Sequence, residues 1–260
     1  MLLLFHSGGG DALAVIMEHP AGRGARLLPT MLPDAGSTPS AMAALLPPEV
    51  AVVEAGPEMW DETLLLPEEE VAMARAVIGR RREFAAGRAS ARAAMRRLGV
   101  EAISIPAAPD RSPIWPPGLA GSITHCEGYC AAAVARAEDV LSLGIDAERH
   151  LPLPEGVERL VCTEPERAWI AERGPDGIQW GLVVFSAKES YYKVWRPLAR
   201  SWLDYLGAEL RIDPDGGTFE VTPLVPIPEA AAPLAAGRGR FALAGGLVLT
   251  AFAAGVRSSP

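Results

Sequence analysis

Two lysines and one glutamate lie close together in the stretch Phe185–Trp195, with a spacing that allows them to bind an anion. In a helix of about 3.6 residues per turn, Glu189 and Lys193 share a face and Lys188 points about a quarter-turn away, so a metal-bound anionic group can contact all three. A purely structural interpretation is equally open. Ser186 followed by Glu189 has the form of a capping box, and Glu189 with Lys193 has the spacing of an ordinary helix ion pair.

Two further carboxylates, Asp146 and Glu148, come at the end of the predicted strand Leu141–Asp146. Side chains two positions apart on a strand point to the same face. Together with Glu189 they offer the carboxylate oxygens that Mg²⁺ prefers, and Mn²⁺ is also possible. A solvated turn would explain Asp146 and Glu148 without a metal. Mg²⁺ takes its remaining ligands from water and substrate phosphates, so the metal interpretation also needs cations that hold phosphates. The candidates are Lys188, Lys193, Arg80, Arg88 and His125.

The charge of the chain limits what this anion can be. A formal net charge of −8 over 260 residues and a pI near 5.1 argue against a general nucleic-acid binder, which needs a basic face. One segment is nevertheless rich in arginine, at Arg75, Arg80, Arg81, Arg82, Arg88, Arg92, Arg96 and Arg97. Its apolar stripe is formed by Phe84, Ala91, Met95 and Leu98. Arg80 falls on this stripe and Arg88 at its edge, and an arginine on the core side needs an anionic partner. Both are predicted to bind a small phosphorylated ligand.

Helices and strands are mixed rather than alternating, which indicates an α+β fold. Strands are expected at residues 50–53, 129–134, 141–146, 218–221 and 239–253, the last broken by a hairpin turn at Gly245-Gly246. The strands at 129–134 and 141–146 are expected to form an antiparallel pair. Helices are expected from Pro67 to Leu98 in two pieces with a turn near Gly79, at 155–160, after the cap residue Thr163, and in the stretch that contains Glu189.

The sequence shows no run of about 18 apolar residues and no signal-peptide pattern, so we expect a cytoplasmic protein without a membrane span. Cys126, Cys130 and Cys162 fit neither a disulfide framework nor a zinc ribbon, and reduced thiols are expected. Residues 1–40 are rich in Gly, Pro, Ala and Ser and are predicted to be a flexible arm.

Several motifs together resemble one family. Gly-Ile-Asp-Ala-Glu at 144–148, followed by Phe-Ser-Ala-Lys-Glu-Ser-x-Tyr-Lys at 185–193, resembles the Sfp-type 4′-phosphopantetheinyl transferases. Residues 80–92, 113–126 and 238–251 are similar to the actinobacterial and enterobactin-synthetase-component-D-like branch of that family. The resemblance implies two similar α+β subdomains, at 41–138 and 139–260, related by a pseudo-two-fold axis. It further implies a monomer that holds coenzyme A in the cleft between the subdomains.

The resemblance also assigns roles to individual residues. Arg80, Arg88, Thr124 and His125 match positions that hold the 3′-phosphoadenosine end of coenzyme A, and Arg111 lies near a further basic position, although Ser112 replaces the usual glycine there. Asp146, Glu148 and Glu189 match the magnesium ligands. Lys188 and Lys193 match lysines near the diphosphate, and Lys193 is the one expected to stabilise the leaving 3′,5′-ADP. Glu164 matches a general base proposed in some members, but it is equally explained as an acid in the first turn of a helix.

The implied reaction is the attack of a serine of an apo acyl or peptidyl carrier protein on the β-phosphorus of coenzyme A, with Mg²⁺ and cations offsetting charge on the diphosphate. Carriers of fatty-acid, polyketide and peptide synthesis, including siderophore synthesis, all remain open. Two alternatives stay beside this one. The protein could be a catalytically inactive coenzyme A-binding regulator, or a magnesium-dependent pyrophosphate hydrolase.

Overall fold

The computed structural model describes residues 2–4, 14–16, 40–235 and 237–257. The chain divides into two units, Met1–Pro39 and Ser40–Pro260. In the first, β1 (Leu2–Leu4) pairs antiparallel with β2 (Ala14–Ile16). Most of the predicted flexible arm lies outside the described residues. All that follows concerns the second unit.

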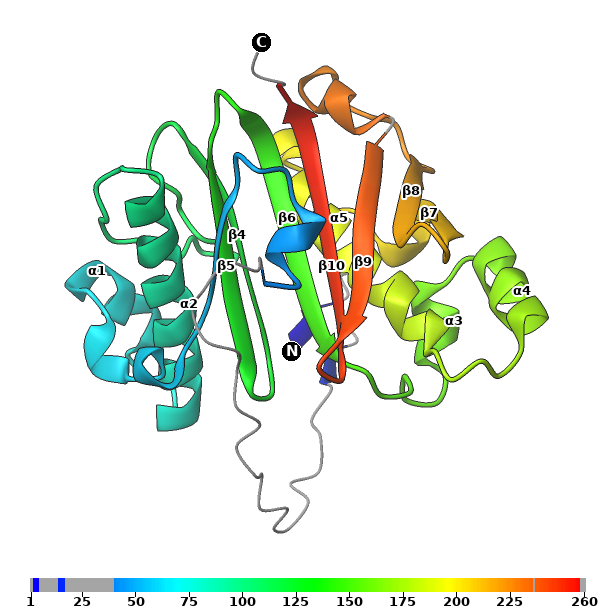
Figure 1. Ribbon diagram of the computed structural model, residues 1–260, viewed down its shortest axis with the longest axis horizontal. Coiled ribbons are helices and arrows are strands. Elements are labelled where there is room, and N and C mark those ends of the chain that lie inside the picture. The colour runs from blue at the N-terminus through cyan, green and yellow to red at the C-terminus, as the bar shows by residue number, and fades with distance from the viewer. Residues whose placement is uncertain (1, 5–13, 17–39, 236, 258–260) are drawn as a thin grey trace. The chain divides into compact units, whose positions relative to one another are not determined.

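The second unit contains two antiparallel sheets (Figure 1). The three-stranded sheet has the order β3-β5-β4, with strands β3 (Ala51–Glu54), β4 (Leu119–Cys126) and β5 (Tyr129–Arg136). The five-stranded sheet has the order β6-β10-β9-β8-β7, with strands β6 (Val140–Arg149), β7 (Ala208–Asp213), β8 (Thr218–Pro223), β9 (Gly237–Ala244) and β10 (Leu247–Val256).

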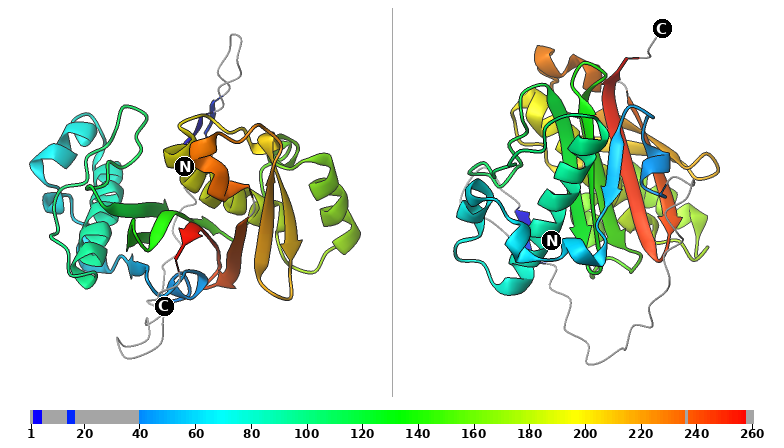
Figure 2. Two further views of the ribbon diagram at one scale, coloured as in Figure 1. Left: turned by 90° about the horizontal axis from the view of Figure 1, so that it is seen from above. Right: turned by 60° about the vertical axis from the view of Figure 1, so that its left-hand side comes forward.

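The helices lie to either side of these sheets, as the view from above shows (Figure 2). They are α1 (Pro67–Glu70), α2 (Ile78–Arg97), α3 (Val157–Val161), α4 (Glu164–Arg173) and α5 (Trp180–Ala199). Short 3₁₀ turns are η1 (Ala43–Leu45), η2 (Pro57–Met59), η3 (Glu62–Leu64), η4 (Val71–Met73), η5 (Tyr205–Gly207) and η6 (Glu229–Leu234). α2 packs against β5, and α5 packs against β6 and β10. The mixed α+β architecture expected from the sequence is confirmed.

Several expected elements are confirmed. The hairpin between β9 and β10 turns at Gly245 and Gly246, whose φ angles of +59° and +76° need glycine. Thr163 caps α4, and its hydroxyl accepts a hydrogen bond from the main-chain N–H of Glu166. On α2, Ala91 and Met95 are fully buried, as the predicted stripe requires.

The predicted antiparallel pair of residues 129–134 and 141–146 is wrong. β5 lies between β3 and β4, and β6 pairs with β10. On the side of β6 that faces β4, the main-chain N–H groups of Ile145 and Ala147 donate to the side-chain hydroxyls of Ser122 and Thr124, both at 3.0 Å. We call these two hydrogen bonds the hydroxyl seam. Side chains, rather than a main-chain ladder, thus join the neighbouring edges of the two sheets.

The interpretation of Ser186 as a helix cap is also wrong. α5 begins at Trp180, so Ser186 lies inside the helix and is fully buried. The apolar residues before Ser186 also belong to α5, so the helix begins almost two turns earlier than the capping pattern predicted. Strands β4 and β7 were not expected from the sequence. In β4, the buried hydroxyl side chains of Ser122 and Thr124 interrupt the apolar pattern.

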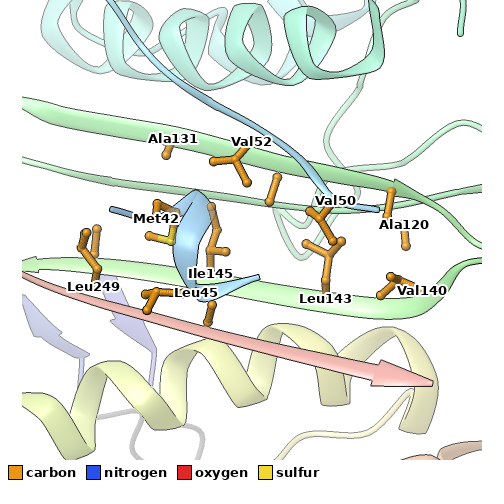
Figure 3. Close-up of a cluster of buried hydrophobic side chains, with 14 residues drawn as sticks. Met42, Leu45, Val50, Val52, Ala120, Ala131, Val140, Leu143, Ile145 and Leu249 are labelled. Carbon is orange, nitrogen blue, oxygen red and sulfur yellow. The ribbon is translucent and has the colours of Figure 1, made fainter. Parts of the chain in front are cut away.

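A hydrophobic core fills the space between the sheets (Figure 3). Leu45 of η1 and Met42, which precedes η1, pack there against residues of both sheets. From β6 the core receives Leu143, Ile145 and Ala147. Since successive side chains of a strand alternate between its faces, the residues between them face the other way, toward α5. Asp146 therefore lies on the α5 face of β6.

Glycine at position 144 lets α5 approach β6 closely. A Cβ atom on Gly144 would lie 2.0 Å from the main-chain oxygen of Ser190 and 3.1 Å from Cβ of Lys193. Both obstacles belong to α5, and the nearer one is backbone, which cannot rotate away. The helix face that carries Lys193 is thereby held against the strand that carries Asp146.

A buried polar hub fixes the other side of α5. Lys188 is 3% exposed, and its ammonium group donates to Val161 O at 2.9 Å, Glu166 Oε2 at 2.8 Å and Tyr205 O at 2.8 Å. Glu166 in turn accepts hydrogen bonds from the main-chain N–H groups of Thr163 and Leu210. All three ammonium donors of Lys188 are used, so this side chain connects α5 to α3, α4, β7 and η5.

We predict that Gly144→Ala lowers the stability of the protein, because the new methyl group forces α5 away from β6. The cost expected for such overpacking is about 1–3 kcal/mol of unfolding free energy. Urea unfolding measures it, with Gly79→Ala as control. Gly79 lies in α2, and a Cβ atom added there would have nothing within 4 Å, so its replacement should be neutral or slightly stabilising. Equal stability of the two variants would contradict the close approach.

We predict that Lys188→Met destabilises the protein by about 3–5 kcal/mol, because it leaves the buried carboxylate of Glu166 without a cation. The measurement is again the urea midpoint. Arg211→Met, which removes an exposed partner of Glu220, serves as control and should leave the midpoint nearly unchanged. An unchanged midpoint for Lys188→Met would show that the hub is not essential and would return Lys188 to the candidate ligand contacts.

Candidate functional site

Asp146 is the centre of a buried polar junction between β6, β4 and α5. It is 1% exposed and accepts hydrogen bonds from Lys193 Nζ at 2.9 Å, Ser186 Oγ at 2.8 Å and Thr124 Oγ1 at 3.4 Å. Lys193 also donates to the main-chain oxygen of Ile145 at 2.8 Å. A buried carboxylate is stable only with such partners, so the position of Lys193 follows from the charge of Asp146.

Glu148 is next to Asp146 on the same face of β6, as the strand period predicts. Its Oε1 atom is buried and has no hydrogen-bond partner among the described residues. Burial raises the pKa of Glu148 to about 8, and the negative charge of Asp146 adds to the rise. An unpartnered buried oxygen beside a second carboxylate is what a cation would satisfy.

Glu189 completes the group of acids from the α5 side. Burial raises its pKa to about 7, again with a contribution from Asp146, while Lys193 acts in the opposite direction. Its Oε1 atom accepts a hydrogen bond from the hydroxyl of Tyr205. The predicted ion pair between Glu189 and Lys193 does not appear among the described contacts, because Lys193 binds Asp146 instead.

These three acids suit a divalent cation by their chemistry. They bring hard oxygen donors together. Two of the acids have raised pKa values, and Glu148 has an oxygen without a hydrogen-bond partner in the part of the chain that the structure describes. Within the described part of the chain, no three His, Cys, Asp or Glu side chains are arranged to hold a metal ion unaided. Mg²⁺ usually keeps several waters and completes its shell with substrate phosphates, so a partial set of protein ligands fits it.

A cationic group lies around the start of α2 and the end of β4. Arg80 Nη1 is 2.8 Å from His125 Nε2 and 3.1 Å from Glu83 Oε2. Arginine can only donate, so His125 Nε2 accepts and the ring is neutral. In agreement, burial lowers the pKa of His125 to about 3, with further lowering by Arg80 and Lys193.

Arg88 is the buried member of this cationic group. It is 4% exposed, it donates from Nε to Ile105 O at 2.6 Å, and its guanidinium lies 4.0 Å from the centre of the Phe84 ring. Its Nη2 atom is buried and has no partner among the described residues. Burial lowers the pKa of Arg88 to about 10. A buried guanidinium with an unused donor needs an anionic group, as the sequence analysis expected for this position.

Arg92, by contrast, already has its anionic partner. It forms a buried pair with Glu69, both of whose carboxylate oxygens lie 2.6 Å from Arg92 Nη1. Glu69 also accepts from the main-chain N–H of Ile105 at 2.9 Å. Arg92 is therefore structural, whereas Arg88 has a buried donor without a partner among the described residues.

The structure gives Thr124 and Lys188 other partners than the predicted ligand. Thr124 is buried beneath the site, where its hydroxyl accepts from Ala147 and donates to Asp146. Lys188 belongs to the polar hub with Glu166. Neither side chain joins the cationic group of Arg80, Arg88 and His125.

Arg111 and Glu164 are both exposed. Arg111 lies in a tight loop closed by the bridge between Ala107 and Pro113, and its φ of +68° is unusual for a residue other than glycine. Glu164 is the first residue of α4. It is therefore an acid in the first turn of a helix, as the structural explanation of this residue expected. Among the described residues, neither side chain forms a hydrogen bond or an ion pair that would connect it to the carboxylates. Their roles in ligand binding and catalysis stay predictions.

Three residues of the site were missed in the sequence analysis. Ser186 was interpreted as a cap, although its distance of seven residues from Lys193 places both on one helix face and could have indicated a shared partner. Thr250 lies opposite Asp146 on β10, with its hydroxyl 3.0 Å from Ser186 Oγ. Tyr205 lies beyond the end of α5, where no periodicity predicts its contact with Glu189.

The comparisons with known proteins agree with this geometry. Residues 68–135 match the model of the 4′-phosphopantetheinyl transferase N-terminal domain, and residues 142–232 match that of the 4′-phosphopantetheinyl transferase superfamily. The second match contains Asp146, Glu148, Glu189 and Lys193, and the first contains Arg80, Arg88 and His125.

Similar curated proteins extend the likeness over most of the chain. The 4′-phosphopantetheinyl transferase Svp of Streptomyces mobaraensis is 47% identical over 82% of this chain and 88% of its own length. Npt of Nocardia iowensis is 40% identical over 72% of this chain and 88% of its own length, and PptT of Mycobacterium tuberculosis is 40% identical over 72% and 84%. Enterobactin synthase component D of Salmonella typhi is 34% identical over 45% of this chain. Because the chain is 47% identical to Svp over 82% of its own length and matches both family models, it belongs to the 4′-phosphopantetheinyl transferase superfamily.

Proposed function

We propose that the protein transfers the 4′-phosphopantetheine arm of coenzyme A to a serine of an apo acyl or peptidyl carrier protein and releases 3′,5′-ADP. The observation that carries this proposal is the arrangement around Asp146. Three side chains surround it, namely Glu148, which has an oxygen without a partner among the described residues, Glu189 and Lys193. Negative and positive groups are therefore available together for a metal-bound diphosphate.

In this proposal the cationic group binds the phosphorylated adenosine end of coenzyme A. Arg88 has a buried donor without a partner among the described residues, and Arg80 and neutral His125 form the rim beside it. Arg111 adds a further cation from its loop. The two subdomains, at residues 41–138 and 139–260, would then each contribute one half of the site. The boundary between the two family matches, at residues 135 to 142, supports this division.

The chemistry follows from the proposed positions. Lys193 lies against Asp146 and stabilises the negative charge that develops on the phosphate leaving as part of 3′,5′-ADP. A carboxylate of the site or a water molecule ordered there would accept the proton of the carrier serine as its oxygen attacks the β-phosphorus. Asp146, Glu148 and Glu189 would hold Mg²⁺, or Mn²⁺ in its place. The ion, when bound, neutralises charge on the diphosphate oxygens. Glu164 is a weaker candidate for the base, because it is exposed and has no described contact with the carboxylates.

We further propose that the protein acts as a monomer in the cytoplasm. No helix in the described residues is long and apolar enough to span a membrane.

The direct test is to incubate the protein with coenzyme A, Mg²⁺ and a panel of apo carrier proteins, and to weigh the carriers by mass spectrometry. A carrier heavier by one phosphopantetheine arm supports the transferase. No mass gain with any carrier would overturn it in favour of a coenzyme A-binding regulator. Release of 3′,5′-ADP without any carrier would instead support a hydrolase.

We predict that Asp146→Asn lowers kcat/KM for transfer by about 100-fold or more, because the amide cannot replace the charge that a metal and Lys193 require. The fold should survive, since the amide oxygen can still accept from Ser186. Circular dichroism checks the fold, and Asp215→Asn, at an exposed turn, is the control that should keep full activity. A rate close to that of the native protein at saturating Mg²⁺ would remove Asp146 from the metal site.

We predict that Arg88→Met raises the KM for coenzyme A by about tenfold and changes kcat much less. The methionine keeps most of the packing but removes the charge and the unused donor, which act on binding rather than on the reacting phosphorus. Arg96→Met, on an exposed position of the same helix, is the control and should leave both constants unchanged. A lower kcat with an unaltered KM would contradict the assignment.

A further inference from the structure

Tyr205 contacts Glu189 from outside the helix that carries it. Tyr205 is the first residue of η5, after α5 has ended, and its hydroxyl donates a hydrogen bond to Glu189 Oε1. An ionised carboxylate has no proton to donate, so the phenol is the donor. Of the two oxygens of Glu189, one is thus assigned to a protein group before any ligand binds.

The position of Tyr205 is fixed independently of this hydrogen bond. Its main-chain oxygen accepts from Lys188 Nζ at 2.8 Å, and its ring packs on Phe185 with 5.6 Å between the ring centres. The turn that holds it begins with Asp204, whose side chain accepts from the main-chain N–H of Leu206 at 3.0 Å. Lys188 is itself held by buried Glu166. The phenol therefore comes to Glu189 from a rigid support.

Glu189 needs such a support. It is partly buried close to Asp146, and the two negative charges repel each other. A hydrogen bond from the Tyr205 hydroxyl opposes this repulsion by holding one oxygen of Glu189 in place. Carboxylates that bind metals are commonly held by hydrogen bonds from residues behind them, and these fix the direction of the remaining oxygen.

We propose that Tyr205 is a positioning residue for the transfer reaction, because its hydroxyl holds Glu189 Oε1 and leaves Oε2 for the divalent cation of the coenzyme A complex. This inference rests on the proposed function, since it takes Glu189 to be a metal ligand. It also gives the polar hub a second purpose. Lys188, which the resemblance placed near the diphosphate, acts on the site through the carbonyl of Tyr205.

A purely structural role for Tyr205 can be separated from this one. Tyr205→Phe keeps the ring on Phe185 and the carbonyl that accepts from Lys188, and it removes the hydroxyl alone. Tyr191→Phe is the matched control. Tyr191 is buried on the same helix as Glu189, and its hydroxyl donates to Leu234 O at 3.3 Å, without a described contact to the carboxylates.

The experiment measures the binding of Mn²⁺ in the presence of saturating coenzyme A and without carrier protein, by the electron paramagnetic resonance signal of free Mn²⁺. We expect Tyr205→Phe to weaken Mn²⁺ binding by about tenfold, the effect typical of removing a residue that orients a metal ligand. Tyr191→Phe should bind as the native protein does, and the thermal midpoints of all three proteins should agree. In the transfer assay, Tyr205→Phe should need more Mg²⁺ for half-maximal rate and keep its KM for coenzyme A.

Three results would overturn the proposal. If Tyr205→Phe binds Mn²⁺ within twofold of the native protein while Asp146→Asn loses it, the metal site stands and the positioning role falls. If the native protein with coenzyme A binds no Mn²⁺ at all, the assignment of Glu189 as a metal ligand falls, and this inference falls with it. Weaker Mn²⁺ binding by both tyrosine variants would likewise show a general effect of lost hydroxyls rather than a specific contact.

Discussion

The site depends on one electrostatic constraint, the burial of the negative charge of Asp146. A carboxylate that is 1% exposed must be compensated, and three donors from β4 and α5 do so. Meeting this constraint brings Lys193 to β6, and the missing side chain of Gly144 makes the approach possible. The same packing carries Glu189, one turn earlier on α5, to the acids of β6. A single buried charge thus organises residues from three elements.

The acids of the site and its arginines lie on different elements of the second unit. The acids gather where β6 meets α5, whereas Arg80 and Arg88 lie on α2, and each group contains a buried polar atom without a partner among the described residues. The proposed ligand, with a cation-binding diphosphate at one end and a phosphate at the other, would satisfy both groups. The net charge of −8 does not attract such a ligand from a distance, so its recognition depends on these local groups.

Local patterns predicted much of this arrangement. The strand period placed Asp146 and Glu148 on one face, and the apolar stripe of α2 indicated that Arg88 needs an anion. The family motifs then connected these elements. What the patterns could not predict depends on the tertiary structure. Lys188 and Lys193 lie on the same helix, yet Glu166 binds one and Asp146 the other, and the acid that reaches each lysine comes from a different element. Tyr205 meets Glu189 only because η5 folds back along α5.

The hydroxyl seam determines how the two sheets can move against each other. A main-chain ladder would resist both sliding and twisting, whereas the side chains of Ser122 and Thr124 act as two point attachments between stiff sheets. One of these attachments also binds Asp146. Thr124 therefore both attaches β4 to β6 and binds the central carboxylate, so a displacement of one strand relative to the other would change the hydrogen bonding of Asp146.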